Sequence, residues 1–262
     1  MNDTQPLVRV DVDAAVAWLI LDSPKTRNAL SDSLLDELIA ALERVRDDLS
    51  VRVVVLGSSH DSVFSAGGDL KALAGDTPTI EKYADLARFP RICSLIAGLG
   101  KPVVCAASGD VLAGAFGLAL ACDLIIAKEG VRFGCPEINV GVFPFMISAL
   151  IVRNLPRMRA NELMMLGGSL SAREAHDLGL VNAVVPAGDF DATVTDWARR
   201  LAEKSPLLMR LGKDALTATR DLPLDAALAA LRAQLALAFT TSDIREGVAA
   251  FVDRREPNWS GR

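Results

Sequence analysis

The sequence predicts an α/β protein in which a core of alternating strands and helices is followed by a segment of helices alone. Two apolar runs, Val51–Leu56 and Val103–Ala107, carry the first part of this prediction. They are apolar at nearly every position, which is typical of strands buried on both faces of a parallel sheet. The second part rests on the residues after Asp189, where helical patterns continue and no strand pattern recurs.

The amino-terminal elements follow from residue spacing and from turn residues. Val8–Asp13 and Val16–Leu21 predict two strands joined by a short turn, and the pair Ser23-Pro24 ends this pattern. Ser31 is a suitable N-cap for a helix that we expect to run to about Leu49, because its leucines recur at helical spacing. A buried strand directly after this helix favours a parallel sheet with crossover connections.

The middle of the chain continues the alternation of helical and strand patterns. Thr79–Leu99 predicts a helix that Pro90 must interrupt or kink, because proline lacks the amide hydrogen that an interior helical position donates. Ser171-Ala-Arg-Glu174 is a capping-box pattern and predicts a helix start. The other expected elements are the helices Ala113–Cys122, Phe145–Arg153 and Ala160–Leu166 and the strands Asp123–Ala127 and Leu180–Val185.

The carboxy-terminal helices mark the one change of pattern in the chain. We therefore divide it into a core of residues 1–195 and a helical segment of residues 196–262. Leu224–Phe239 is apolar on more than one face, and such a helix needs burial on several sides. We expect a second copy of the chain to cover it, with packing on its own core as the alternative. The expected helices are Phe190–Lys204, Leu207–Thr219, Leu224–Phe239 and Ser242–Val252.

Composition and charge exclude several classes of protein. Hydrophobic residues make up 51% and charged residues 23% of the 262-residue chain, which predicts a packed core rather than disorder. The net charge is −5 and basic residues form only short clusters, so nucleic acid is not expected as a partner. No uncharged apolar run reaches the ~18 residues of a membrane span, and no amino-terminal signal core is present, so no membrane partner is expected.

The four cysteines and two histidines carry no disulfide or metal signature. None of the cysteines forms a CxxC motif, and three of them stand in apolar runs, so we expect reduced, buried thiols and a cytoplasmic location. No cluster of His, Cys or Asp has the spacing of metal ligands, so no metal site is expected. The phosphate-binding loop and the GxSxG nucleophile motif are also absent.

Two glycine turns are the first candidates for function. In FSAGGDL, residues 64–70, Gly67 and Gly68 permit a sharp turn and let a ligand approach the backbone without meeting a Cβ. Gly114 stands in a second turn, after a buried strand pattern and at an expected helix start. Backbone amides at such places are available to an external acceptor, and two that converge form an oxyanion hole. Taken singly, each turn has an ordinary structural explanation, because glycine commonly ends a strand.

One acid, Glu137, is the candidate for proton transfer. It lies between Pro136 and an apolar run that ends at Phe145. A carboxyl group in apolar surroundings has a raised pKa, which suits a residue that takes up a proton and returns it. An ordinary carboxylate at a helix start is the alternative.

Five motifs occur in one order over essentially the whole chain. They are FSAGGDL, SGDVLAGAFGLALACD, FGCPEINVGVFP, AREAHDLGLVNAVVP and EGVAAFVDRREPNW. Together they resemble the crotonase superfamily, also called the enoyl-CoA hydratase/isomerase family. The resemblance implies a crotonase-like spiral of ββα turns, followed by a carboxy-terminal helical oligomerisation segment that forms trimers, often paired into hexamers. It also implies an acyl-CoA thioester as substrate, with no cofactor besides the coenzyme A that the substrate carries.

The resemblance assigns roles to single residues. Gly68 and Gly114 match the residues whose amides form the family's oxyanion hole, and Glu137 matches the second of the two catalytic glutamates of the hydratases. Phe251 and Arg254 match a stretch that can close over the coenzyme from a neighbouring subunit. The positions that match substrate-binding or coenzyme-binding residues are Lys25, Arg27, Ala29, Ala66, Asp69, Leu70, Lys71, Phe251 and Arg254.

The chain departs from the family's pattern at the first catalytic glutamate. That position, three residues after the second oxyanion glycine, is Gly117. Hydration uses two acids, whereas moving a double bond from the β,γ to the α,β position needs only one base. We therefore expect isomerisation with Glu137 alone. The alternatives are a hydratase that works with one glutamate or with Asp110 or Glu81 as a replacement acid, a thioester hydrolase, and an acyl-CoA-binding protein without catalysis.

Overall fold

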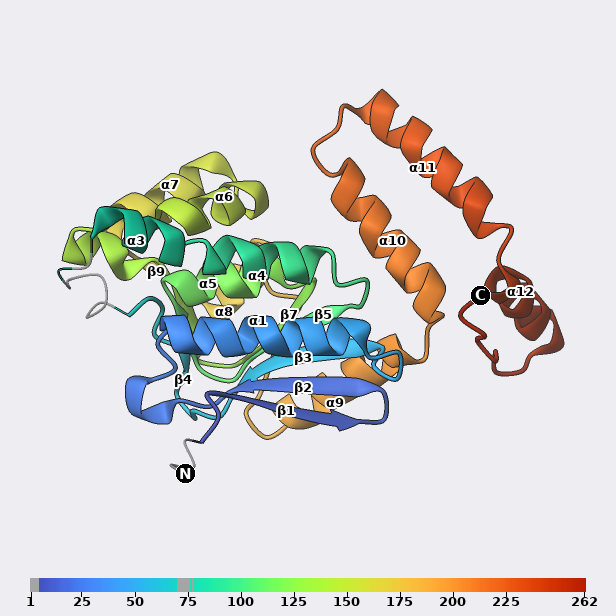
Figure 1. Cartoon of the computed structure of the whole chain (residues 1–262), viewed down its shortest axis with the longest axis horizontal. Helices are drawn as coiled ribbons and strands as arrows, with labels where there is room; N and C mark the ends of the chain where they lie inside the picture. The colour runs from blue at the N-terminus through green and yellow to red at the C-terminus, as the bar shows by residue number, and fades with distance from the viewer. Residues whose placement is uncertain (1–4, 70–75, 77) are drawn as a thin grey trace.

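One mixed sheet of six strands forms the centre of the fold. The computed structural model describes residues 5–69, 76 and 78–262. The strand order is β1-β2-β3-β5-β7-β10; β1 and β2 pair antiparallel, and every other neighbouring pair is parallel (Figure 1). The bounds are β1 Val8–Asp13, β2 Val16–Leu21, β3 Val53–Ser58, β5 Val103–Ala107, β7 Leu124–Lys128 and β10 Ala183–Val185.

Helices cover both faces of this sheet. On one face, α1, α4 and α5 join their apolar side chains to those of the strands in the larger hydrophobic core. On the other face, α9 packs on β2, β3 and β7. All of β3 from Val53 to Leu56 is buried, which confirms the expectation of a strand covered on both sides. The bounds are α1 Asp32–Asp47, α4 Arg88–Ala97, α5 Gly114–Ala121 and α9 Phe190–Ala202.

A second sheet of four short strands was not predicted. Its order is β4-β6-β8-β9; β4, β6 and β8 are parallel, and β9 pairs antiparallel with β8. Along the chain, β3, β5 and β7 of the larger sheet are each followed by one strand of the smaller sheet and then by helix. This is the ββα succession that the family resemblance implies. The bounds are β4 Val63–Ser65, β6 Asp110–Leu112, β8 Arg132–Gly134 and β9 Ser169–Ser171.

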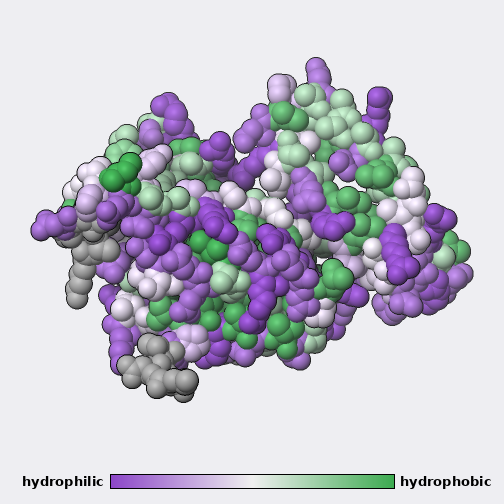
Figure 2. All heavy atoms as spheres, viewed as in Figure 1, coloured by the Kyte–Doolittle hydropathy of each residue, from purple (hydrophilic) through white to green (hydrophobic). Residues whose placement is uncertain are grey.

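The last three helices extend away from both sheets (Figure 1). As predicted, no strand occurs after Asp189. α10 and α11 pack on each other, and no residue of α11 is buried. Leu224, Leu228 and Leu235 of α11 are each more than half exposed, and hydrophobic surface is visible over this region in Figure 2. The bounds are α10 Pro206–Thr219, α11 Leu224–Ala238 and α12 Ser242–Asp253.

Two predicted helix caps are confirmed. The Ser31 side chain accepts from the Leu34 amide at 3.3 Å at the start of α1. Ser171 and Glu174 form the reciprocal capping box at the start of α8. The remaining helices are α3 Thr79–Asp85, α6 Phe145–Asn154, α7 Arg157–Leu166 and α8 Ala172–Asp177, with 3-10 turns η1 Pro24–Thr26 and η2 Pro136–Val140.

The predicted break at Pro90 is wrong in its position. The helical stretch divides into α3 and α4 at Leu86 and Ala87, and Pro90 lies in the first turn of α4. Proline is tolerated there because first-turn amides have no acceptor within the helix. The strand expected from Leu180 also begins later, because the Leu180 amide still donates to the Ala175 carbonyl at the end of α8.

All four cysteines are free thiols, as predicted. Cys105 and Cys135 are buried, and Cys93 and Cys122 are partly buried. No helix of the described chain has both the length and the apolar character that crossing a bilayer requires.

An ion pair between a buried lysine and a more exposed aspartate attaches α10 to the core. Lys213 Nζ donates to Asp123 Oδ2 at 2.6 Å and to the Lys101 carbonyl oxygen at 2.9 Å. The Lys213 side chain is only 8% exposed. Asp123 also accepts from the Val103 amide at 2.7 Å. The carboxylate therefore joins α10 to the first residue of β5, and removal of either charge would leave the other without compensation.

Removing the Lys213 ammonium should lower the free energy of unfolding by about 1 kcal/mol, because the Asp123 carboxylate loses its counter-ion and the Lys101 carbonyl loses a donor. Lys213→Met keeps the length of the side chain, and urea unfolding followed by circular dichroism measures the effect. Arg159→Met breaks the exposed pair with Glu162 and is the control, with a much smaller expected effect. Equal losses of unfolding free energy in the two variants would contradict a stabilising role of the Lys213–Asp123 pair.

Candidate active site

Three neighbouring strands of the smaller sheet each lead into one of the predicted site groups. β4, β6 and β8 are parallel and paired in one row. Gly68, Gly114 and Glu137 each lie two or three residues beyond the last residue of their strand. Since the carboxyl ends of parallel strands share one edge, the sheet brings both glycine turns and the acid to the same edge.

The first turn lies in close backbone contact with the second. Gly67 has a φ of +87°, which favours glycine. A Cβ built on Gly67 would stand 2.8 Å from the Leu112 carbonyl oxygen and 3.1 Å from the Gly114 amide nitrogen, so a side chain has no space there. At Gly68, by contrast, the Cβ position has no atom of the described chain within 4 Å, and the residue is exposed. A ligand can therefore approach the Gly68 backbone.

The second turn begins α5 and lies beside the first. Ala113 precedes the helix with φ 54° and ψ −130°, a conformation that is strained for a residue with a Cβ. A Cβ built on Gly114 would stand 3.7 Å from the Gly68 amide nitrogen. Among the described residues, no protein acceptor takes the amide hydrogen of Gly68 or Gly114. Two adjacent amides without protein acceptors are the arrangement that binding an oxyanion requires.

Glu137 lies in η2, directly after β8. The Ala113 amide donates to the Gly134 carbonyl at 2.8 Å, which joins the end of β8 to the second turn. Glu137 Oε2 is buried and has no hydrogen-bond partner within the described chain. Burial raises the pKa of Glu137 above its ordinary value of 4.5. A carboxylate of raised basicity with one buried oxygen that has no partner in the described chain is suited to take a proton from a bound molecule.

Cys135 is the other titratable group at this strand end. Its side chain is fully buried. Burial, with a smaller contribution from the Glu137 carboxylate, raises the pKa of Cys135 to about 12. The reactive thiolate is therefore not populated near neutral pH. Of these two groups, Glu137 is the better candidate for proton exchange near neutral pH.

The position expected for a second acid is closed by apolar side chains. A Cβ built on Gly117 in α5 would stand 2.8 Å from Ile147 Cβ and 2.9 Å from Phe89 Cζ. Ile147 of α6 and Phe89 of α4 are buried, with 3% and 6% of their surface exposed. A carboxylate has no space here. Sequence reasoning identified Gly117 but missed both apolar residues, because their contact joins three helices that are far apart in the chain.

One group of predicted coenzyme-binding residues lies beside the first turn. The Ala66 amide donates to the Arg27 carbonyl at 3.0 Å, and the Leu30 amide donates to the Gly67 carbonyl at 2.8 Å. These bonds hold the segment after β2 against the segment after β4, and its two cationic side chains are exposed. The predicted residues in this group are Lys25, Arg27, Ala29 and Ala66.

The other predicted residues are not all at this edge. Asp69 is partly buried and follows the first turn, whereas Leu70 and Lys71 lie outside the described residues. Phe251 of α12 and Arg254 at its C-cap lie at the far end of the molecule from β4 (Figure 1). Phe251 is 85% exposed. Within a single chain these last two residues are remote from the glycine turns.

The acids considered as replacements for the missing glutamate are placed elsewhere. Asp110 accepts from the Arg132 amide at 2.9 Å and from the Arg132 guanidinium at 3.0 Å. Glu81 is exposed on α3. Asp110 is thus engaged in an ion pair, and neither observation favours these residues as a second acid.

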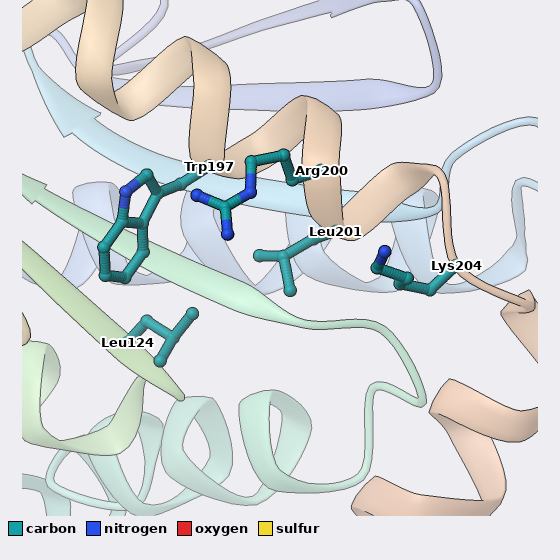
Figure 3. Close-up of a pocket in the computed structure, with 5 residues that line it drawn as sticks. All are labelled: Leu124, Trp197, Arg200, Leu201 and Lys204. Atoms are coloured by element: carbon teal, nitrogen blue, oxygen red, sulfur yellow. The ribbon is translucent and has the colours of Figure 1, made fainter.

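Cavities in the described part of the chain lie away from the glycine turns, and two of them adjoin the carboxy-terminal helices. One, of about 260 Å³, lies between β7 and α9, and Figure 3 shows Trp197 and Leu201 projecting from the helix toward Leu124. The other, of about 880 Å³, lies between α10 and the helices α4 and α6, and Leu124 and Leu201 also line it. The two cavities adjoin, and they leave open space between the core and the carboxy-terminal helices.

Comparison with known proteins covers almost the whole chain. The sequence profile described as enoyl-CoA hydratase/isomerase matches residues 11–262. The chain belongs to the enoyl-CoA hydratase/isomerase family. It is an enzyme of the hydratase/isomerase type that acts on acyl-CoA.

Relatives in this family match over nearly their full length. The 2,3-dehydroadipyl-CoA hydratase of Escherichia coli K12 is 33% identical, with 94% of this chain and 96% of the relative covered. The carnitinyl-CoA dehydratase of Proteus mirabilis is also 33% identical, with 95% and 96% covered. A crystal structure of an enoyl-CoA hydratase from Mycobacterium smegmatis superposes with a TM-score of 0.94 at 31% identity, covering 97% of this chain and 99% of that one. The crotonase-like fold predicted from the sequence is confirmed.

Glu137→Gln should reduce turnover by about 10³-fold, because glutamine cannot accept the proton. In the wild type, the acid limb of kcat/KM should lie above pH 4.5, since burial raises the pKa of the base. The raised pKa also affects folding stability. Because the pKa of Glu137 is higher in the folded than in the unfolded state, Glu137 stabilises the fold below pH 4.5. This contribution is lost as the pH rises through the folded-state pKa. At pH 7 the variant should therefore melt at or above the wild-type Tm.

The control for this variant is Glu162→Gln, which removes an exposed carboxylate on α7. It should leave turnover and its pH profile unchanged. Full activity of Glu137→Gln, or an acid limb at or below pH 4.5, would contradict the role of Glu137 as the base.

Proposed function

We propose that this protein is an enoyl-CoA isomerase that moves a carbon–carbon double bond from the β,γ to the α,β position of an acyl-CoA thioester. The observation that carries the proposal is the apolar closure of Gly117 by Ile147 and Phe89. Water addition is best served by two acids, one for the water and one for the α-carbon. The closed position leaves Glu137 without a partner, and isomerisation needs only one base.

The proton shuttle is balanced by Glu137 alone. The ionised carboxylate takes a proton from C2, and the electron pair of that C–H bond moves toward the thioester carbonyl to give a conjugated enolate. The carboxyl group then gives the proton to C4, and the electrons return to form the α,β double bond. No atom is gained or lost. The absence of a hydrogen-bond partner at Oε2 in the described chain leaves this oxygen available for both steps.

The amides of Gly68 and Gly114 would hold the oxygen on which charge develops. Their closeness and the absence of protein acceptors among the described residues support this role. Each preorganised donor of this kind contributes roughly 3 kcal/mol to stabilising the transition state. Apolar packing of Ile147 and Phe89 at Gly117, three residues after Gly114, would lower the local dielectric and strengthen this interaction.

The coenzyme would lie along the first turn. Lys25 and Arg27 supply exposed positive charge next to Ala66, which suits a ligand with several phosphate charges. Ala29 and Asp69 flank the same turn, and we propose them as further coenzyme contacts. Leu70 and Lys71 stay predictions from the sequence.

A hydratase is the second candidate, and the names of the relatives favour it. The Escherichia coli relative is named a hydratase and the Proteus mirabilis relative a dehydratase. In this chain, water addition would proceed with Glu137 as the one acid/base. A binding protein without catalysis is disfavoured, because a buried carboxylate oxygen without a partner only destabilises a fold that does not use it.

The deciding experiment offers 3-hexenoyl-CoA and 2-hexenoyl-CoA to the purified protein in separate reactions. Isomerisation leaves the mass unchanged and produces the ultraviolet absorbance of a conjugated thioester. Water addition raises the mass by one water, and thioester hydrolysis releases free coenzyme A. We expect conversion of the 3-enoyl substrate to the 2-enoyl product. Water addition to the 2-enoyl substrate without turnover of the 3-enoyl substrate would overturn the proposal.

We further propose that the active form is a homotrimer, alone or paired into a hexamer. Burial of α11 by a neighbouring copy would remove its exposed leucines from water, which favours association. A neighbour would also bring Phe251 and Arg254 to a coenzyme site that they do not reach within their own chain. The open space beside α10 supports packing of a second copy there.

Leu228→Asp combined with Leu235→Asp should convert the assembly to monomers, because both leucines lie on α11 and are more than half exposed in the single chain. Light scattering after gel filtration measures the molar mass. The control is Leu49→Asp, which changes an equally apolar residue that is 95% exposed outside the carboxy-terminal helices. A wild type that is monomeric at micromolar concentration would contradict the trimer.

A further inference from the structure

Asn28 is a fully buried polar residue that directly follows four exposed residues, 24–27. It follows η1 and has a φ of 53°, in the left-handed region that asparagine tolerates better than most residues. Its carboxamide accepts from the Ser23 amide at 2.7 Å and donates to Ser58 Oγ at 2.8 Å and to the Phe64 carbonyl at 3.1 Å. Asn28 therefore joins its own loop to the end of β3 and to β4.

The backbone of Asn28 is linked to the first glycine turn by a second route. Ser65 Oγ donates to the Asn28 carbonyl at 2.7 Å and accepts from the Gly67 amide at 3.2 Å. Ser65 is the last residue of β4 and is fully buried. One hydroxyl thus bridges the Asn28 loop and the residue that precedes Gly68.

The orientation of the Gly68 amide follows from the peptide group that it shares with Gly67. A trans peptide is planar, with its C=O and N–H bonds pointing in opposite directions. The Gly67 carbonyl accepts from the Leu30 amide at 2.8 Å, two residues after Asn28. This bond fixes the plane of the Gly67–Gly68 peptide and turns the Gly68 N–H away from Leu30. The Ser65 hydroxyl accepts from the Gly67 amide and so holds the preceding peptide group, between Ala66 and Gly67.

We propose that Asn28 and Ser65 are positioning residues that set the direction of the Gly68 N–H for the developing oxyanion. The inference rests on the proposed function, because it concerns the same oxyanion hole. Neither residue contacts the substrate: Ser65 and Asn28 are both fully buried and act through the Gly67–Gly68 peptide. The chain offers a matched control in Ser58, a hydroxyl that touches the same Asn28 carboxamide but has no bond to Gly67.

The experiment compares Ser65→Ala with Ser58→Ala in the full-length protein. Ser65→Ala should lower kcat on 3-hexenoyl-CoA by about 10-fold or more and change KM by less than about 3-fold, because misdirecting a donor weakens only the transition-state interaction. Ser58→Ala should keep kcat within about 2-fold of wild type, although it removes the bond to the Asn28 carboxamide and two further hydrogen bonds of this partly buried hydroxyl. Asn28→Asp, which loses the donor to Phe64, should act in the same direction as Ser65→Ala.

A spectroscopic measurement separates this inference from the proposed reaction. The absorbance band of cinnamoyl-CoA moves to longer wavelength when hydrogen-bond donors polarise its thioester carbonyl. Wild type and Ser58→Ala should shift the band, and Ser65→Ala should reduce the shift at saturating ligand. If Ser65→Ala does not fold, Ser65→Cys replaces it, since a thiol keeps the shape but is a weaker donor and acceptor.

The outcomes separate the two proposals. A wild-type band shift that survives Ser65→Ala, with unchanged kcat, rejects the positioning role and leaves the oxyanion hole in place. A wild type that does not shift the band rejects the hole itself and the positioning role with it. A wild type that shifts the band but adds water instead of isomerising rejects the proposed reaction, and the loss of the shift in Ser65→Ala still supports the positioning role.

Discussion

The parallel pairing of β4, β6 and β8 is the interaction on which the rest of the candidate site depends. Each strand has only three residues, yet together they deliver the Gly68 turn, the Gly114 turn and Glu137 to one edge. The larger sheet and its helices hold these strands in place, since each short strand of this trio follows a strand of the larger sheet. The ββα succession thus sets the position of these backbone amides. The direction of a backbone N–H depends on the fold around it, because no side-chain rotation can change it.

The apolar contact at Gly117 is the feature on which the proposed choice of reaction rests. Ile147 and Phe89 fill the space in which a second acid would stand, and they are ordinary core residues by every sequence criterion. A glutamate at position 117 would therefore have to displace buried core side chains. If the proposed function is correct, the packing at this one glycine separates isomerisation from hydration at a common oxyanion hole.

The elements that were predicted correctly from the sequence are those defined by residues close together in the chain. β1 and β2 were predicted to the residue because alternation and turn residues define them, and Ser31 and Ser171 were identified as caps because capping is a contact within four residues. The smaller sheet was not predicted because its strands have three residues each, which is too short to show the alternation of apolar and polar residues that marks a strand. The glycine turns and Glu137 were found from turn chemistry and family resemblance, whereas the roles proposed for Ile147, Phe89 and Ser65 depend on neighbours distant in sequence.

The strained backbone of Ala113 indicates that the surrounding fold, and not the local sequence, holds the second turn in its conformation. A residue with a Cβ at φ 54° and ψ −130° costs about 1–3 kcal/mol, so this turn would relax if it were cut out of the protein. The direction of the Gly114 N–H is therefore a collective property of the fold, enforced by the strand ends around it. A short peptide of the same sequence would not retain this N–H direction. A substitution that lowered the backbone strain of the turn would change the geometry on which the proposed chemistry relies.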